Sequence, residues 1–341
     1  MPTANLSKAA LLMLFVVVVS LISWEYFWRH KGFGIAYNDD EGLWAKNRAD
    51  VYQPLDKATV FIGSSRIKFD LDIPTWETTT GENVVQLALH GSCPRGALVD
   101  LGNDENFKGK LIIDITEGLY FGGWEDQRIK NRVKFYNDAT PAERVSAKVG
   151  FGLESQFVFI DKELFSMSAL LADLRIADRK GMRPDGIFPK KFSYTNFRRQ
   201  ETMTDEFAKD TAMQRQVTNL WSMWGAHSKD HGITGDTLQK IFTEAQTAVS
   251  KIKARGGKVI FVRTPSSGVY WENEPISHPR AEYYDKLVSV TNCTGIHFMD
   301  YPELKNFTCP EWSHLTHADA ILYTKGLIKI LEGQNWFAKR N

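Results

Sequence analysis

The sequence is poor in cysteine, which limits the metal and disulfide chemistry it can carry. Its 341 residues include three cysteines, Cys93, Cys293 and Cys309, and no C-x-x-C pair. A thiolate zinc site is therefore not expected. Cys293 and Cys309 flank a short segment near the C-terminus and can form a disulfide in an oxidising compartment. Two free buried thiols agree with the spacing equally well.

The chain also lacks an excess of charge of either sign. The 42 Lys and Arg residues nearly balance the 41 Asp and Glu residues, which gives a net charge of +1. No overall field therefore attracts the chain to nucleic acid, and no basic block is interleaved with aromatic residues. Internal repeats and low-complexity tracts are missing too. The composition is typical of a globular protein, and the length allows one large α/β domain with insertions or two smaller domains.

One long apolar run lies near the N-terminus. Residues 9–24 read AALLMLFVVVVSLISW, and about 16 residues is the short end of what spans a bilayer. Bulky aromatic residues follow, where a cleaved signal peptide has small ones. They stand where a membrane-interface belt would lie: Trp24, Tyr26, Phe27 and Trp28. The run therefore predicts an uncleaved membrane anchor that covers residues 1–31. The flanking basic residues do not decide its orientation in the membrane.

After a predicted linker over residues 32–56, short apolar strands alternate with helical patterns. The expected buried strands are 58–62, 83–89, 110–115, 258–263 and 295–299. The expected helices of this part are 94–102, 237–254, 280–290 and 318–331. Strands joined by helical crossovers predict a three-layer α/β/α domain over residues 57–335, with a central and mostly parallel sheet.

A long region without strand-like alternation separates the third and fourth expected strands. It covers about residues 125–232, and helical periodicity is visible over 165–179 and 204–224. Between these two segments, residues 181–194 are rich in Gly, Pro and Lys and indicate an exposed loop. The region is therefore predicted to be a mostly helical insertion.

The first expected strand ends in Gly63-Ser64-Ser65-Arg66. Open α/β sheets place their chemistry at the carboxyl ends of parallel strands, so a serine here is a candidate nucleophile, although serine is also a common turn residue. A nucleophilic serine needs an oriented histidine and oxyanion donors. His314 lies just ahead of the last expected helix, and Glu311 precedes it by three residues. A carboxylate at that spacing can support the Nδ1–H of the ring.

These segments resemble the sequence blocks of the SGNH/GDSL hydrolases. Gly63-Ser64-Ser65-Arg66 looks like the first block, in which the nucleophile maps onto Ser65. Gly91, after the second expected strand, matches the glycine whose N–H joins the nucleophile's own N–H in the oxyanion hole. His314-Leu315-Thr316 and the residues that follow are similar to the last block, which maps the base onto His314 and the triad carboxylate onto Glu311. The resemblance implies a flavodoxin-like sheet.

The chain departs from the family pattern in three places. Glu311 stands where the family usually has aspartate. The third block is absent, since Ile115-Thr116-Glu117-Gly118 replaces G-x-N-D, so the asparagine oxyanion donor is missing and Thr116 is a candidate substitute. Loss of one such donor typically costs about 10²–10³ in rate. Asp319 occupies a position where the last block has a small residue, and it is interpreted as an acidic residue at the start of the last expected helix.

The missing third block, the anchor and the insertion together resemble one branch of the superfamily. Its members are membrane-anchored SGNH-like proteins that assist membrane-bound O-acyltransferases in polysaccharide O-acetylation or teichoic-acid D-alanylation. The resemblance implies a single-pass membrane protein with a periplasmic or extracellular globular part. It implies transfer of a short acyl group, expected to be acetyl, through an acyl-serine to a cell-envelope polysaccharide, without cofactor or metal. A carbohydrate esterase or deacetylase, and a non-catalytic binding partner of a membrane acyltransferase, stay open as alternatives.

Several basic residues allow a binding role or a structural one. Arg66 follows the candidate nucleophile and can bind an acidic substrate or form an internal salt bridge. The insertion carries four more, which indicate either a solvated basic face or a contact with an anionic glycan or lipid: Lys190, Lys191, Arg198 and Arg199.

Overall fold

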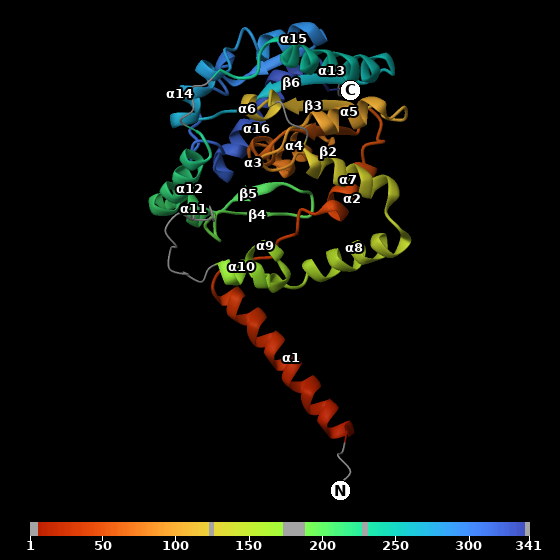
Figure 1. Cartoon of the computed structure of the whole chain (residues 1–341), viewed down its shortest axis with the longest axis vertical. Helices are drawn as coiled ribbons and strands as arrows, with labels where there is room; N and C mark the ends of the chain where they lie inside the picture. The colour runs from red at the N-terminus through yellow and green to blue at the C-terminus, as the bar shows by residue number, and fades with distance from the viewer. Residues whose placement is uncertain (1–5, 123–125, 173–187, 227–230, 338–341) are drawn as a thin grey trace. The chain divides into compact units, whose positions relative to one another are not determined.

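A parallel five-stranded sheet is the centre of an α/β fold (Figure 1). The computed structural model describes residues 6–122, 126–172, 188–226 and 231–337. The sheet has the order β2-β1-β3-β6-β7, and every neighbouring pair is parallel. Its strands are β1 (Ala58–Ile62), β2 (Asn83–Gln86), β3 (Lys110–Asp114), β6 (Lys258–Arg263) and β7 (Thr294–His297). The predicted α/β class and the predicted parallel sheet are confirmed.

Successive side chains of the central strands pack in two different hydrophobic cores, because successive residues of a strand point to opposite faces of the sheet. Val60 and Ile62 of β1 pack in one core, and Phe61 packs in the other. The first core includes buried residues of α5 (Arg95–Asn103), α13 (Gly235–Ala254) and α15 (Tyr284–Thr291). The second includes residues of α3 (Ser65–Asp70), α4 (Ile73–Thr80) and α16 (His317–Gly333).

The backbone after β2 continues beside the end of β1. Leu87 N donates to Phe61 O at 2.8 Å, and Leu89 N donates to Gly63 O at 3.3 Å. The segment that was predicted as strand to residue 89 therefore keeps bonding to its neighbour past the last β2 residue. This brings the loop that contains Gly91 to the same edge of the sheet as Ser65.

Residues 32–56, predicted as a linker, contain the helix α2 (Glu41–Ala49). Asp40 caps it by accepting from the backbone N–H groups of Gly42 and Leu43. Trp44 is fully buried in the first core, and its Nε1 donates to Leu87 O at 3.1 Å. Tertiary packing of Leu43 and Trp44, both fully buried, rather than a regular apolar pattern, accounts for a helix in a polar stretch.

The predicted insertion contains a β-hairpin as well as helices. Its elements are α7 (Gln127–Asp138), α8 (Pro141–Glu154), η1 (Val158–Ile160), α9 (Lys162–Phe165), α10 (Met167–Ala172), β4 (Ser193–Thr195), β5 (Glu201–Met203), α11 (Asp205–Lys209) and α12 (Thr211–Met223). The expected helix 204–224 divides at Asp210, which caps α12 by accepting from Ala212 N at 2.8 Å. Part of the expected helix 165–179 and part of the expected loop 181–194 lie outside the described residues. The remaining elements are α6 (Glu117–Tyr120), α14 (Gly268–Ser277) and η2 (Phe298–Asp300).

The chain divides into two compact units. The N-terminal unit is formed by residues 1–38 and 145–184, and the sheet unit by residues 39–144 and 185–341. The N-terminal unit contains α1 (Leu6–His30), a helix of 25 residues without a buried side chain. Among the described residues, α1 is the one helix long and apolar enough to cross a membrane.

The three cysteines are free thiols. Cys309 is buried and donates to Pro265 O, and Cys293 is half-buried. Of the two arrangements that their spacing allows, the structure has the unpaired one.

Candidate active site

Ser65 lies at a sharp strand-to-helix turn of the sheet unit. β1 ends at Ile62, Gly63 and Ser64 form the turn, and Ser65 is the first residue of α3. Ser64 is the N-cap of this helix, and its Oγ accepts from Arg66 N at 3.3 Å. The two adjacent serines therefore have different positions: Ser64 caps the helix, while the Ser65 side chain projects from its first turn.

The three predicted triad residues lie in one hydrogen-bonded row. Ser65 Oγ is 2.8 Å from His314 Nε2, and His314 Nδ1 is 3.0 Å from Glu311 Oε1. The imidazole proton belongs on Nδ1 in this row, because an ionised carboxylate can only accept. Nε2 then faces the serine hydroxyl as an acceptor. Glu311 and His314 are 0% and 2% exposed, so these two residues are shielded from water, while Ser65 is half-buried.

Glu311 is held by donors on both carboxylate oxygens. Oε1 accepts from the backbone N–H groups of Ser313 at 3.3 Å and His314 at 2.6 Å, in addition to the ring of His314. Oε2 accepts from Trp221 Nε1 at 2.6 Å. The glutamate therefore forms the same link to histidine that the family forms with aspartate. Trp221 was not among the predicted site residues, because a tryptophan in a helix is usually a core residue.

The helix α3 contacts the histidine loop at each successive residue from 313 to 315. Arg66 Nε donates to Ser313 Oγ at 3.4 Å, the Phe69 ring stacks on His314 at 4.2 Å between centroids, and Asp70 Oδ1 accepts from Leu315 N at 3.0 Å. Burial raises the pKa of the Asp70 carboxyl well above its ordinary value. The same six-residue helix thus presents the serine and orients the base.

Gly91 follows β2 and has a left-handed backbone conformation, which favours glycine. Its φ is +50°, and its N–H donates to no acceptor among the described residues. Arg128 of α7 donates to His90 O at 2.8 Å and to Gly91 O at 2.7 Å. In a trans peptide the N–H points opposite to the carbonyl, so the Gly91 N–H points away from Arg128. The structure thus leaves this predicted oxyanion donor unengaged.

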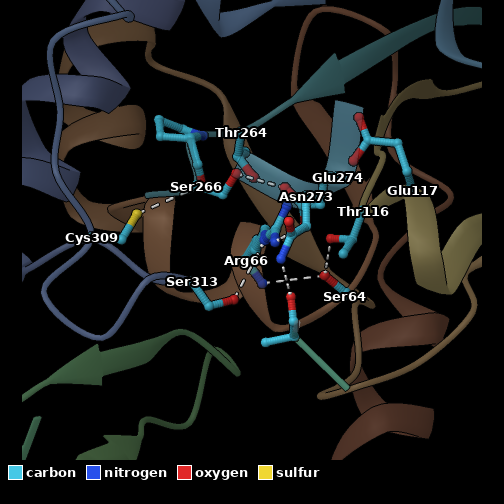
Figure 2. Close-up of polar contacts among 12 residues, drawn as sticks. Ser64, Arg66, Thr116, Glu117, Thr264, Ser266, Asn273, Glu274, Cys309 and Ser313 are labelled. Atoms are coloured by element: carbon cyan, nitrogen blue, oxygen red, sulfur yellow. Dashed lines mark hydrogen bonds and ion pairs between the residues drawn. The ribbon is translucent and has the colours of Figure 1, made fainter. Parts of the chain in front are cut away.

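Thr116 lies beside the nucleophile turn but is engaged with Ser64. The two hydroxyl oxygens are 2.7 Å apart, and a dashed line marks this bond in Figure 2. Thr116 is the residue before α6 and follows the end of β3. Its side chain is therefore part of the hydrogen-bonded turn at Ser64, the residue directly before Ser65.

Arg66 is buried in an ion network behind the turn (Figure 2). It pairs with one oxygen of Glu274, and Arg263 pairs with the other oxygen and with Glu117. Burial acts to raise the pKa of Glu274, but the charges of Arg66 and Arg263 outweigh it and hold the pKa at about 2. Of the two readings of Arg66, these contacts favour the internal salt bridge. One feature of the sequence indicated this buried ion network: the charged Arg263 at the end of an apolar strand.

The basic residues of the insertion do not form one solvated face. Arg199 is fully buried, pairs with Asp39 and donates to the Ala88 carbonyl at 3.0 Å. Arg198 pairs with Glu77, and Lys191 pairs with Glu206. Arg199 therefore braces the segment that leads from β2 to Gly91. The predicted solvated basic face is wrong for this residue, because burying a charge needs a partner and Asp39 supplies it.

The last block ends in an ordinary helix cap. Thr316 Oγ1 accepts from Asp319 N at 3.2 Å and donates to Asp319 Oδ2 at 2.8 Å. This agrees with Asp319 as a helix-start acid.

The arrangement supplies what nucleophilic acyl chemistry needs: a serine at a strand end, an imidazole on it and a carboxylate on the imidazole. In the part of the chain that the structure describes, no group of three or more His, Cys, Asp or Glu side chains is arranged to hold a metal ion. No protein-family model matches the chain, and no curated protein matches its sequence. The family resemblance therefore stays a prediction.

Proposed function

We propose that the chain is an SGNH-type serine acyltransferase of the cell envelope, anchored by α1 with its three-layer sheet unit outside the cytoplasm. It transfers a short acyl group, acetyl in the simplest case, to a polysaccharide hydroxyl and works beside a membrane-bound O-acyltransferase. The single observation that carries the proposal is the row from Ser65 Oγ through His314 to Glu311, at 2.8 and 3.0 Å. The donor, the acceptor and the partner rest on the family resemblance.

The chemistry follows from the row. His314 Nε2 takes the proton of Ser65 as its Oγ attacks the acyl carbonyl, and Glu311 stabilises the imidazolium that forms. The N–H groups of Ser65 and Gly91 stabilise the oxyanion. The C–O or C–S bond to the leaving group then breaks, and His314 returns the proton to it. In the second half, His314 deprotonates an acceptor hydroxyl, whose oxygen attacks the acyl-serine carbonyl. The bond from the acyl carbon to Ser65 Oγ then breaks, and His314 returns the proton to Ser65 Oγ.

Hydrolysis uses the same residues with water as the acceptor, so an esterase or deacetylase is the nearest alternative. A second candidate is a non-catalytic binding partner of a membrane acyltransferase. The engagement of Thr116 with Ser64 favours it, because the Thr116 hydroxyl is then not free to replace the family's asparagine. Ser65 would in that case be an unreactive turn serine.

The test is covalent labelling of the purified full chain with a serine-directed phosphonate, together with hydrolysis of a nitrophenyl acetate ester. We expect a single adduct on Ser65, lost in Ser65→Ala and in His314→Asn. Ser64→Ala is the matched control, since it removes the neighbouring hydroxyl and keeps the row; it should still form the adduct. No adduct on the wild-type chain, or an adduct that persists in Ser65→Ala, would overturn the proposal. Acyl transfer to polysaccharide in place of ester hydrolysis separates transferase from esterase.

A further inference from the structure

The helix α8 has an exposed apolar stripe. Residues from Val145 onward belong to the N-terminal unit. On one side of the helix, Phe151 is half-buried and Glu154 is buried. Val145, Val149 and Leu153 on another side are 61%, 56% and 45% exposed. A soluble helix buries its apolar stripe and exposes its polar side, but this apolar stripe of α8 is exposed.

The stripe is continuous. A spacing of four residues places the three side chains on one face of an α-helix, over a length of about 12 Å. Phe157, just beyond the end of α8, is 38% exposed and extends the apolar surface. Gly152 adds no side chain between them. Four large apolar residues in a row are more than the single exposed side chains that are normal on a protein surface.

Hydrogen bonds fix the end of this stripe to a defined level of α1. Glu25 accepts from Val158 N at 2.9 Å and from Phe159 N at 3.3 Å, and Arg29 donates to Gln156 O at 2.9 Å. Glu25 is the first charged residue after the apolar run. The segment after α8 is thus bonded to α1 at the point where the run ends.

That level is where a bilayer changes from hydrocarbon to headgroups. About 16 apolar residues of α1 match the short end of a bilayer span. Trp24 and Tyr26 are exposed beside Glu25, and aromatic residues concentrate at the membrane interface. Lys148, on the border of the stripe, and Arg29 can bind anionic headgroups. Figure 1 shows α9 and α10 of the same unit next to this end of α1.

We propose that α8 lies in the membrane–water interface, with Val145, Val149, Leu153 and Phe157 against the acyl chains of a phospholipid surface. The proposal rests on the membrane location given to α1 under the proposed function and not on acyl transfer. A span and an interfacial helix that are bonded together contact the bilayer at two places. The N-terminal unit is then fixed in depth and in rotation about α1.

The test places an environment-sensitive fluorophore on single cysteines of the full chain in vesicles of phosphatidylethanolamine and phosphatidylglycerol. Cys93 and Cys309 are buried, so the background needs only Cys293→Ser. The probe site is Val149→Cys. Val17→Cys in α1 reports the bilayer interior, and Lys240→Cys on the exposed face of α13 reports water. Lipids that carry a spin label at shallow and deep positions quench the fluorophore according to depth.

We expect emission from position 149 to shift to shorter wavelength and to be quenched best by the shallow label. Position 17 should be quenched best by the deep label, and position 240 by neither. Quenching at 17 without quenching at 149 would overturn the interfacial helix and leave the span intact. No quenching at position 17 would show that α1 does not enter the bilayer. That result would also overturn the interfacial helix, and it is independent of the outcome of the ester assay. A Val149→Cys chain that forms disulfide dimers in the vesicles would assign the stripe to a second copy and overturn the lipid contact.

Discussion

Trp221 Nε1 donates a hydrogen bond of 2.6 Å to Glu311 Oε2. Trp221 belongs to α12 in the insertion, and Glu311 lies on the loop before α16. No other described residue donates to this oxygen, and Glu311 has no exposed surface. A buried carboxylate oxygen without a donor is costly. The insertion therefore contributes directly to the alignment of the row formed by Ser65, His314 and Glu311.

Trp221→Phe should lower kcat for ester hydrolysis by about 10- to 100-fold, because a hydrogen bond to a charged group contributes about 1.5–3 kcal/mol. KM should change little, since the indole contacts the carboxylate rather than the substrate. Trp224→Phe, at an exposed position of the same helix end, is the control. Equal losses in the two variants would contradict a positioning role for Trp221.

Gly63→Ala should destabilise the fold and disable Ser65. A Cβ at this position would lie 2.7 Å from Asp114 Cβ and 2.8 Å from Ile67 Cγ2. Both neighbours are in the packed interior, where overpacking costs about 1–3 kcal/mol. We expect a lower midpoint of thermal unfolding and slower phosphonate labelling. Gly152→Ala on α8 is the control, because a Cβ added there has no atom within 4 Å. An equal drop in its midpoint of thermal unfolding would refute the steric explanation.

Asp114 should make the free energy of unfolding fall as pH rises. Burial raises the pKa of its carboxyl from 3.8 to about 6, so the native state binds this proton more tightly than the unfolded chain. Its stabilising effect is complete below about pH 4 and is lost as pH rises through about 6, by up to about 3 kcal/mol.

Asp114→Asn removes this titration and keeps an oxygen to accept from Thr264 Oγ1, which lies 3.0 Å from Asp114 Oδ1. The variant should gain stability relative to wild type between about pH 4 and pH 7, as measured by chemical unfolding at each pH. Asp138→Asn, at an exposed position, is the control for removal of a carboxylate. A difference in stability between Asp114→Asn and wild type that does not change with pH would contradict the raised pKa of Asp114.

The parts of the fold that the sequence predicted correctly depend on short-range patterns. The apolar, β-branched runs of β1 and β6 were predicted at their observed bounds, since buried parallel strands have that composition. Glu311 and His314 are three residues apart, so their contact is local. Ser65 was predicted to meet them because carboxyl ends of parallel strands share one edge.

The missed features depend on contacts between distant segments. The strands β4 and β5 have three residues each, too few to show alternation. The bond between Trp221 and Glu311 joins residues 90 positions apart, and a tryptophan in an amphipathic helix carries no sign of such a partner. The pairing of Arg66 with Glu274 crosses 208 positions. The sequence does not show which distant carboxylate pairs with Arg66, so a substrate role and a structural role could not be separated.

Arg128→Met should impair the oxyanion hole without unfolding the chain. The guanidinium donates to His90 O at 2.8 Å and to Gly91 O at 2.7 Å, and its side chain is 50% exposed. Without these donors the Gly91 peptide is free to rotate, and its N–H no longer points away from α7. Complete loss of an oxyanion donor costs about 10²–10³ in rate, so partial misorientation should lower kcat about 10-fold with KM unchanged. Lys134→Met on the same helix should keep full activity. A fall in kcat in both variants, or a rise in KM alone in Arg128→Met, would exclude this role for Arg128.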